Sequence, residues 1–170
     1  GSLGGIDIFE FDIDASFPIK PSPVTYISGV VYDAKNIDKK VPALIQLSDI
    51  QTGEVFYEHI ADYYTGSFVV PFAEDKTYAL TLTHHGYLLY SEQVHLKTVS
   101  KTLQIPMQPI AIGNTVVLNN VFFDTDSYAL KPESKVELQA IVDFMNTNTT
   151  VCFEIGGHTD NVGNKQHNIA

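Results

Sequence analysis

The sequence lacks arginine altogether, contains a single cysteine, and has no apolar run close to the ~20 residues that a membrane-spanning helix requires. The scarcity of basic residues disfavours nucleic-acid binding, because phosphates are recognised by clustered positive charge. The net charge of −10 agrees with this, and we interpret the acidic surface as a solubility feature. One cysteine cannot form an intrachain disulfide, so cysteine content does not indicate a compartment.

The N-terminal stretch, residues 1–23, contains no signal peptide pattern, since it has neither a basic region nor an apolar core. We expect the natural N-terminus and any targeting signal to lie upstream. Residues 6–13 alternate apolar and acidic side chains, which predicts one half-buried strand. The prolines at 18, 21 and 23 then predict an extended linker. A lone strand needs a partner, so we expect it to pack on the next domain or to belong to a preceding one.

Residues 24–109 alternate short strand patterns with turn signals, and they show no helical period. This spacing predicts a seven-stranded antiparallel β-sandwich. One of the turn signals is the stretch 36–38. The strands are expected at residues 25–32, 43–49, 55–61, 67–71, 77–83, 88–96 and 102–107.

Residues 111–170 change character and predict a truncated α+β unit with the order β-α-β. Pro132 suits the first turn of a helix, and Glu133 suits its positive end. Strands are expected at residues 115–123 and 151–155, on either side of the helix. The apolar face of the helix is expected to consist of Val136, Leu138, Ile141, Val142 and Met145.

Two motifs in this unit resemble the OmpA-like peptidoglycan-binding family. Residues 121–130 resemble the opening strand and loop of that domain. Residues 155–163 resemble its second strand and Gly-His-Thr-Asp turn, and Asn168 follows Asp160 by eight residues, where the family has an asparagine. The resemblance covers residues 111–170, the N-terminal half of such a domain. The whole chain is therefore expected to be multidomain and mainly β, a sandwich followed by an OmpA-like half-domain.

The resemblance implies noncatalytic binding to the diaminopimelate stem peptide of peptidoglycan, in a protein that ties the Gram-negative outer membrane to the cell wall from its periplasmic side. By position, Asp160 would pair with the ligand's ammonium. The family's arginine, which would hold the ligand's carboxylate, would fall a few residues beyond Ala170. The other candidates, which would add polar contacts or line the same mouth, are Thr159, Asn168, Asp124 and Asp126.

Each candidate also has a structural interpretation. On spacing alone, Asp160 would cap a helix near Asn161 or Lys165, and the family resemblance reverses this preference. Thr159 and Asn168 suit local backbone hydrogen bonds equally well. Asp124 and Asp126 also fit the alternative of loop residues exposed to water. The histidines form no metal-ligand spacing, and no nucleophile or phosphate-loop motif occurs, so we expect no metal, no cofactor and no enzymatic activity.

The sandwich region resembles the carboxypeptidase-regulatory or transthyretin-like module, which serves for spacing or protein contact. Residues 3–9 resemble the closing strand of a Tol-B-like β-propeller, which would place a propeller upstream. The alternative function is thus a periplasmic or cell-surface protein-interaction module that binds other envelope proteins through the sandwich. The tyrosines that would form its binding face are Tyr63, Tyr64, Tyr87 and Tyr90. The resemblance is carried by residues 27–33, 42–45, 66–71, 76–82 and 85–87.

A half-domain leaves apolar surface on its helix and strands, including Val136, Ile141 and Val142. We expect this surface to be covered by the sandwich, by self-association with another copy, or by residues that follow the given sequence.

Overall fold

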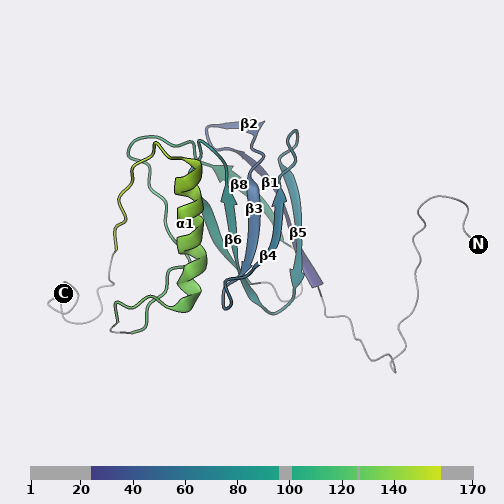
Figure 1. Ribbon diagram of the computed structural model, residues 1–170. Coiled ribbons are helices and arrows are strands. Elements are labelled where there is room, and N and C mark those ends of the chain that lie inside the picture. The colour runs from purple at the N-terminus through teal and green to yellow at the C-terminus, as the bar shows by residue number, and fades with distance from the viewer. Residues whose placement is uncertain (1–23, 96–100, 126, 158–170) are drawn as a thin grey trace, which may run out of the picture.

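The computed structural model describes residues 24–95, 101–125 and 127–157. They form a mainly β structure of two facing sheets, with one α-helix on an outer face (Figure 1). The first sheet contains β1 (Val24–Asp33), β2 (Asn36–Lys40), β5 (Ser67–Ala73) and β8 (Lys101–Met107). The second sheet has the order β4-β3-β6-β7 and contains β3 (Leu44–Asp49), β4 (Val55–Ile60), β6 (Thr77–Thr83) and β7 (Tyr90–His95).

The two sheets share one apolar core, which defines the sandwich. Burial alternates along β1 and β5, as expected of strands with one face inward. Together the two sheets contribute a contiguous cluster of buried side chains. Its members with no exposed surface are Ile27, Val31, Ala43, Ile45, Leu47, Val70, Leu80, Leu82 and Ile105.

The strand expectations are confirmed for all seven predicted strands, and two features differ. An additional strand, β2, forms where a turn was expected, and it pairs with β1 at Tyr32–Lys40 and Asp33–Asn36. Because β2 is polar and largely exposed, it has no apolar alternation that the sequence could reveal. In addition, β8 pairs with β1 in parallel, whereas an all-antiparallel sandwich was expected.

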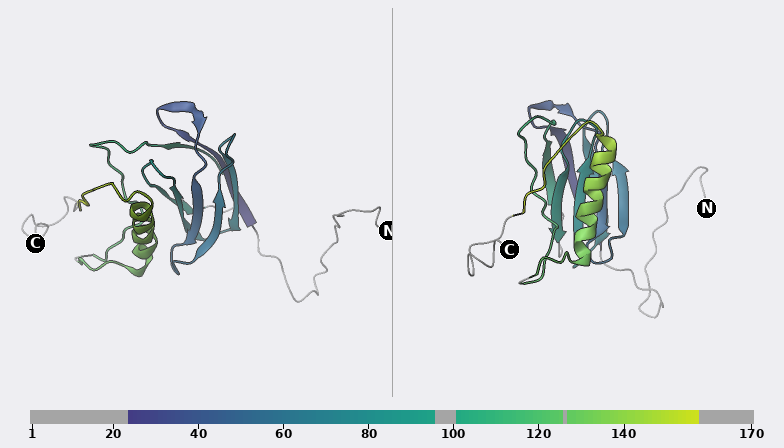
Figure 2. Two further views of the ribbon diagram at one scale, coloured as in Figure 1. Left: turned by 45° about the horizontal axis from the view of Figure 1, so that its top comes forward. Right: turned by 60° about the vertical axis from the view of Figure 1, so that its left-hand side comes forward.

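The predicted helix is present as a 3₁₀ turn, η1 (Pro132–Ser134), followed by α1 (Lys135–Thr147). It lies on the outer face of the second sheet (Figures 1 and 2). Ala79 and Thr81 of β6 alternate with the inward-facing Leu80 and Leu82, yet they are 0% and 2% exposed. The helix therefore adds a third layer that covers this sheet.

The buried face of α1 differs from the predicted one. Val136 and Ile141 are buried as expected, but Val142 and Met145 are 47% and 45% exposed. Ala140 and Phe144 are buried instead and pack with Leu89. The sequence places apolar residues on two adjacent stripes of the helix, and packing on the sandwich selects the stripe that contains Phe144. Of the three coverings expected for this helix, the structure shows the sandwich.

The two strands expected beside the helix, at residues 115–123 and 151–155, do not form in the structure. Their surroundings provide one isolated bridge, between Phe123 and Leu130. A strand needs a neighbouring ladder to satisfy its backbone groups, and the described residues provide no such neighbour here. Several side chains of these stretches are exposed, among them Val117 (75%) and Ile155 (63%).

Within the described ranges, no helix has the length and apolar character needed to cross a bilayer.

Candidate functional site

Of the predicted ligand-binding residues, the structure describes only Asp124. Asp160, Thr159, Asn168 and Asp126 lie outside the described residues. Asp124 is exposed and accepts an ion-pair contact from Lys131 Nζ at 2.7 Å. The hydrogen bond and the charge of Asp124 raise the pKa of Lys131. A cationic ligand group at Asp124 would therefore share this carboxylate with the ammonium of Lys131.

The loop that bears Asp124 is attached to the start of the helix. The backbone N–H of Phe122 donates to Ser134 Oγ at 2.8 Å, and that hydroxyl contacts Phe122 O at 3.1 Å. The backbone N–H of Lys131 also donates to Phe122 O, at 2.9 Å. These contacts close the loop at its base and hold Asp124 near the N-terminal end of the helix.

A buried glutamate joins the first turn of the helix to the sandwich. Glu137 of α1 is 0% exposed. Its Oε2 accepts from Ser91 Oγ of β7 at 2.6 Å and from Asn120 Nδ2 at 3.0 Å, and its Oε1 accepts from the Asn119 N–H at 3.2 Å. Asn119 Nδ2 in turn donates to Ser91 O at 2.9 Å. One side chain thus connects the helix, β7 and the stretch before the helix.

The far end of the helix is attached as well. His85 Nδ1 lies 3.1 Å from Thr147 O, and the Gly86 N–H donates to Asn148 Oδ1 at 3.0 Å. The chain then continues past Val151, which packs on the same apolar cluster as Leu89. The described residues end at Gly157, the first residue of the Gly-His-Thr-Asp turn. The segment that leads into the motif therefore departs from a helix fixed to the sandwich at its first turn and at its C-terminal end.

One side of the sandwich, between β7 and β8, is closed by polar contacts. Lys101 Nζ of β8 donates to Glu92 Oε1 of β7 at 2.8 Å, and Tyr90 Oη donates to Glu92 Oε2 at 2.6 Å. Burial and the neighbouring carboxylate of Glu92 raise the pKa of Tyr90. The phenol therefore remains a donor, and this side of the sandwich offers no opening at these residues.

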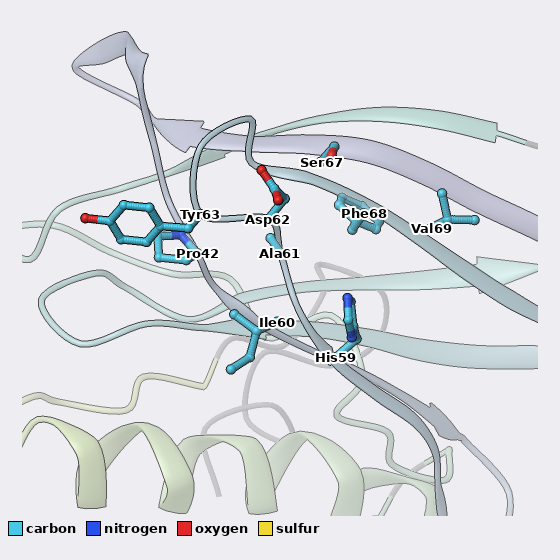
Figure 3. A pocket seen from close by; sticks show the side chains of 9 residues that line it. All are labelled: Pro42, His59, Ile60, Ala61, Asp62, Tyr63, Ser67, Phe68 and Val69. Carbon is cyan, nitrogen blue, oxygen red and sulfur yellow. The ribbon is translucent and has the colours of Figure 1, made fainter.

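The opposite side, between β4 and β5, contains a hollow of about 620 Å³ (Figure 3). Tyr57 Oη of β4 donates to Val69 O of β5 at 3.1 Å and bridges the two strands. His59 pairs with the fully buried Ile45, so it projects from the inner face of β4. The hollow is lined by Pro42, His59, Ile60, Ala61, Asp62, Tyr63, Ser67, Phe68 and Val69.

The loop between β4 and β5 is held by Asp62. Its Oδ1 accepts from the N–H of Tyr64 at 3.1 Å and from the N–H and the hydroxyl of Thr65, both at 2.8 Å. These contacts, with the Thr65 N–H first among them, lower the pKa of Asp62 and keep it ionised. The next two residues present exposed aromatic rings: Tyr63 and Tyr64 are 70% and 84% exposed, with their centroids 5.2 Å apart.

The predicted tyrosine face is therefore divided. Tyr63 and Tyr64 are at the surface, whereas Tyr87 is 6% exposed and Tyr90 is half-buried.

The hollow itself was not predicted, because it depends on the distance between two edge strands. The signal that could have indicated it is β4, where apolar side chains occur at Val55, Phe56 and Ile60 without the strict alternation of a half-buried strand.

Tyr87 serves a structural role, because its hydroxyl donates to Asp33 Oδ2 at 2.8 Å. The N–H of Lys35 donates to Asp33 Oδ1 at 2.8 Å, and Lys39 Nζ lies 3.3 Å from Oδ2. The Lys35 N–H, followed by the Tyr87 hydroxyl and Lys39, lowers the pKa of Asp33 below its ordinary 3.8. This carboxylate joins the β1–β2 hairpin to the 84–90 loop.

We expect Asp33→Asn to destabilise the protein at pH 7 and to matter progressively less in acid. A carboxyl group with a lowered folded-state pKa stabilises the fold above its unfolded pKa, and this contribution is lost as the pH falls through the folded value. The difference in melting temperature between the two proteins should therefore shrink below about pH 3.8. Circular dichroism melts at pH 7 and in steps below pH 4 measure it. An equal difference at every pH would contradict the assigned contacts.

Comparisons with known proteins add little to this geometry. No protein-family model matches the sequence, and no curated protein matches it. Similar solved structures include the Bacillus anthracis TIE protein, at 12% identity and a TM-score of 0.41, covering 51% of this chain and 18% of that one. A putative membrane-associated protein from Bacteroides fragilis has 22% identity and a TM-score of 0.38, with 55% and 30% covered. The C-terminal fragment of pilus adhesin SpaC from Lactobacillus rhamnosus GG has 18% identity and a TM-score of 0.40, with 54% and 47% covered.

The chain thus spans less than half the length of each of these three proteins. What the structure itself defines is a mainly β protein of two sheets and one short helix. Within the described ranges, no group of three or more His, Cys, Asp or Glu side chains is placed to hold a metal ion.

Proposed function

We propose that this chain is part of a noncatalytic peptidoglycan-binding protein of the Gram-negative envelope, which ties the outer membrane to the cell wall. The observation that carries the proposal is the Ile-Gly-Gly-His-Thr-Asp-Asn sequence at residues 155–161, with Asp160 as the carboxylate for the ammonium of diaminopimelate. In this proposal residues 24–109 are a transthyretin-like spacer, and residues 111–170 are the first half of an OmpA-like domain. Residues 1–23 are the last strand of an upstream propeller and its linker.

The described geometry supports the proposal in one respect. The helix and the stretch that leads to the motif are fixed to the sandwich through Glu137, His85 and Asn148. Binding sites gain affinity when the groups that carry them are ordered before the ligand arrives. An attached helix would give Asp160 and Asp124 a common support.

Retention on isolated sacculi tests the proposal. The chain is expressed with any residues that its gene encodes after Ala170, and the wild type should be retained. Asp160→Asn removes the charge at constant size, so we expect retention to fall at least about tenfold, since a charged pair loses one partner. Asp143→Asn is the matched control, because Asp143 is a carboxylate on α1 that accepts from the Gln139 amide at 3.0 Å. Equal retention of the Asp160 variant and the wild type would refute the site.

A second candidate function is a protein-interaction module that uses the sandwich. The specific observation in its favour is the exposure of large apolar side chains along β4 and the loop that follows it. Val55, Phe56 and Ile60 are 49%, 58% and 57% exposed, and Tyr63 and Tyr64 are more exposed still. Large exposed apolar side chains grouped in one region are a feature of protein-interaction sites. Capture of an envelope protein by residues 1–110 alone, without the helix, would favour this function over the first.

A further inference from the structure

The strand β4 lies at the end of the second sheet, and it combines three properties that favour contact with another polypeptide. Among the described residues it pairs only with β3, so one row of its backbone groups faces outward. Such an edge is a template for an additional strand. Apolar side chains line this edge, and the hollow beside it opens toward β5 (Figure 3).

The facing strand, β5, is also an edge strand within the described residues, since it pairs only with β1. It is less suited to accept a strand, because Pro71 has no N–H to donate. Its contribution is to the wall of the hollow, through Phe68 and Val69. An extended segment that pairs with β4 can therefore place alternate side chains between the two sheets, in contact with His59 and Phe68.

Charge indicates which segment fits. Glu54, Glu58 and Asp62 recur at four-residue intervals on β4 and its flanks, and among the described residues none of them forms an ion pair. Glu58 accepts only from a neutral amide, that of Gln46 at 2.8 Å. The contacts to Asp62 Oδ1 come from uncharged loop donors. The edge thus presents uncompensated negative charge next to apolar surface.

This charge disfavours two occupants. A second copy would bring a chain of net charge −10, and pairing of two β4 strands about their centre would place Glu58 of one copy close to Glu58 of the other. The chain's own residues 6–13 carry Asp7, Glu10 and Asp12, which repel the same edge. A strand with lysine or arginine at alternate positions is complementary.

We propose that the outer edge of β4 and the adjoining hollow form a docking site for an extended strand of a partner protein, with alternating apolar and basic side chains. The backbone of that strand extends the second sheet beyond β4. Its apolar side chains enter the hollow beside His59 and Phe68, and its basic side chains, on the opposite face, meet Glu54, Glu58 and Asp62. This site gives the second candidate function a location and a partner class, and it is separate from the peptidoglycan contact.

A synthetic peptide of alternating valine and lysine, about eight residues long, is the probe, since strands have this length. Fluorescence anisotropy measures its binding to the chain, and hydrogen exchange locates it. We expect binding with slowed exchange of the amides of residues 55–60. A matched peptide of alternating valine and glutamate should not bind.

Two charge reversals distinguish binding at β4 from general attraction of a basic peptide to an acidic protein. Glu58→Lys should lower the affinity for the valine–lysine peptide at least about tenfold, since like charges repel across an interface. Asp143→Lys is the control, because it changes the net charge by the same amount as Glu58→Lys. Asp143 also accepts a hydrogen bond from a glutamine amide. Because Asp143 lies on α1, peptide binding should be unchanged. Equal weakening by both variants would overturn the proposal, as would protection on β2 or β7.

Hydrogen exchange of residues 55–60 is also measured without peptide at several protein concentrations. If their amides became more protected as the concentration rose, the occupant would be a second copy, and the proposal would be overturned. The Glu58→Lys variant should be retained on sacculi as well as the wild type is. This result keeps the test of the β4 site separate from the test of the peptidoglycan site.

Discussion

Replacing Gly66 with alanine is expected to lower the free energy of unfolding by about 3–5 kcal/mol, a large part of the stability of a domain of this size. Gly66 has a φ of +67°, and a Cβ at this position would lie 2.3 Å from Val31 O. The backbone cannot retreat easily, because Gly66 O accepts from Val31 N–H at 2.9 Å and Gly66 N–H donates to Asp62 O at 2.8 Å. The substitution therefore strains the loop and displaces it from β1.

Gly113 provides the control, since its φ is +84° but a Cβ there meets nothing within 4 Å. Gly113→Ala should cost only the left-handed backbone conformation, about 1 kcal/mol. Urea unfolding followed by circular dichroism measures both variants. Because Gly66 shapes the loop that borders the hollow, any folded Gly66→Ala protein should also bind the valine–lysine peptide more weakly. Equal losses of stability in the two variants would contradict the close approach to Val31.

Replacing Glu137 with alanine is expected to detach α1 from the sandwich, at a cost of about 3–5 kcal/mol. The substitution leaves the Ser91 hydroxyl, the Asn120 amide and the Asn119 N–H without their acceptor in a buried setting, and each such donor costs about 1–3 kcal/mol. The sum is reduced where water enters the space left by the side chain. Glu137→Gln keeps one acceptor oxygen and the size of the side chain, so it should cost less.

Hydrogen exchange distinguishes detachment from global unfolding. In the Glu137→Ala variant the amides of residues 135–147 should exchange rapidly while those of β1, β3 and β6 remain protected. Asp143→Ala, on the same helix, should change stability by no more than about 0.5 kcal/mol. Unchanged protection of the helix in Glu137→Ala would show that the apolar contacts of Phe144 and Ile141 alone hold it in place.

The strands of the sandwich could be predicted because their information is local. Residues 77–83 alternate or continue in apolar character between clear turn signals, and the observed β6 has the predicted bounds. The choice of strand neighbours is not local. The parallel pairing of β8 with β1 is set by how the whole chain crosses between sheets, and no residue of β8 signals it.

The helix illustrates the same division. Its position followed from Pro132 and the apolar period, but its buried face depended on which surface it met. Glu137 was not predicted as a buried residue, because a glutamate is seldom fully buried unless it has partners, and Ser91 and Asn120 are supplied from elsewhere in the chain. For the candidate site, Asp124 is placed near the start of the helix, and the role of Asp160 stays a prediction.

The parallel pairing of β1 with β8 determines how the sandwich would respond to tension. These are the first and last strands of the sandwich, and they pair over seven positions, from Ile27–Lys101 to Asp33–Met107. A pull on Val24 and a pull beyond Met107 act along neighbouring strands in opposite directions, so the hydrogen bonds of the ladder are sheared together rather than opened one at a time. In the proposed tether between a membrane and a wall, this arrangement would make the sandwich a mechanically resistant link.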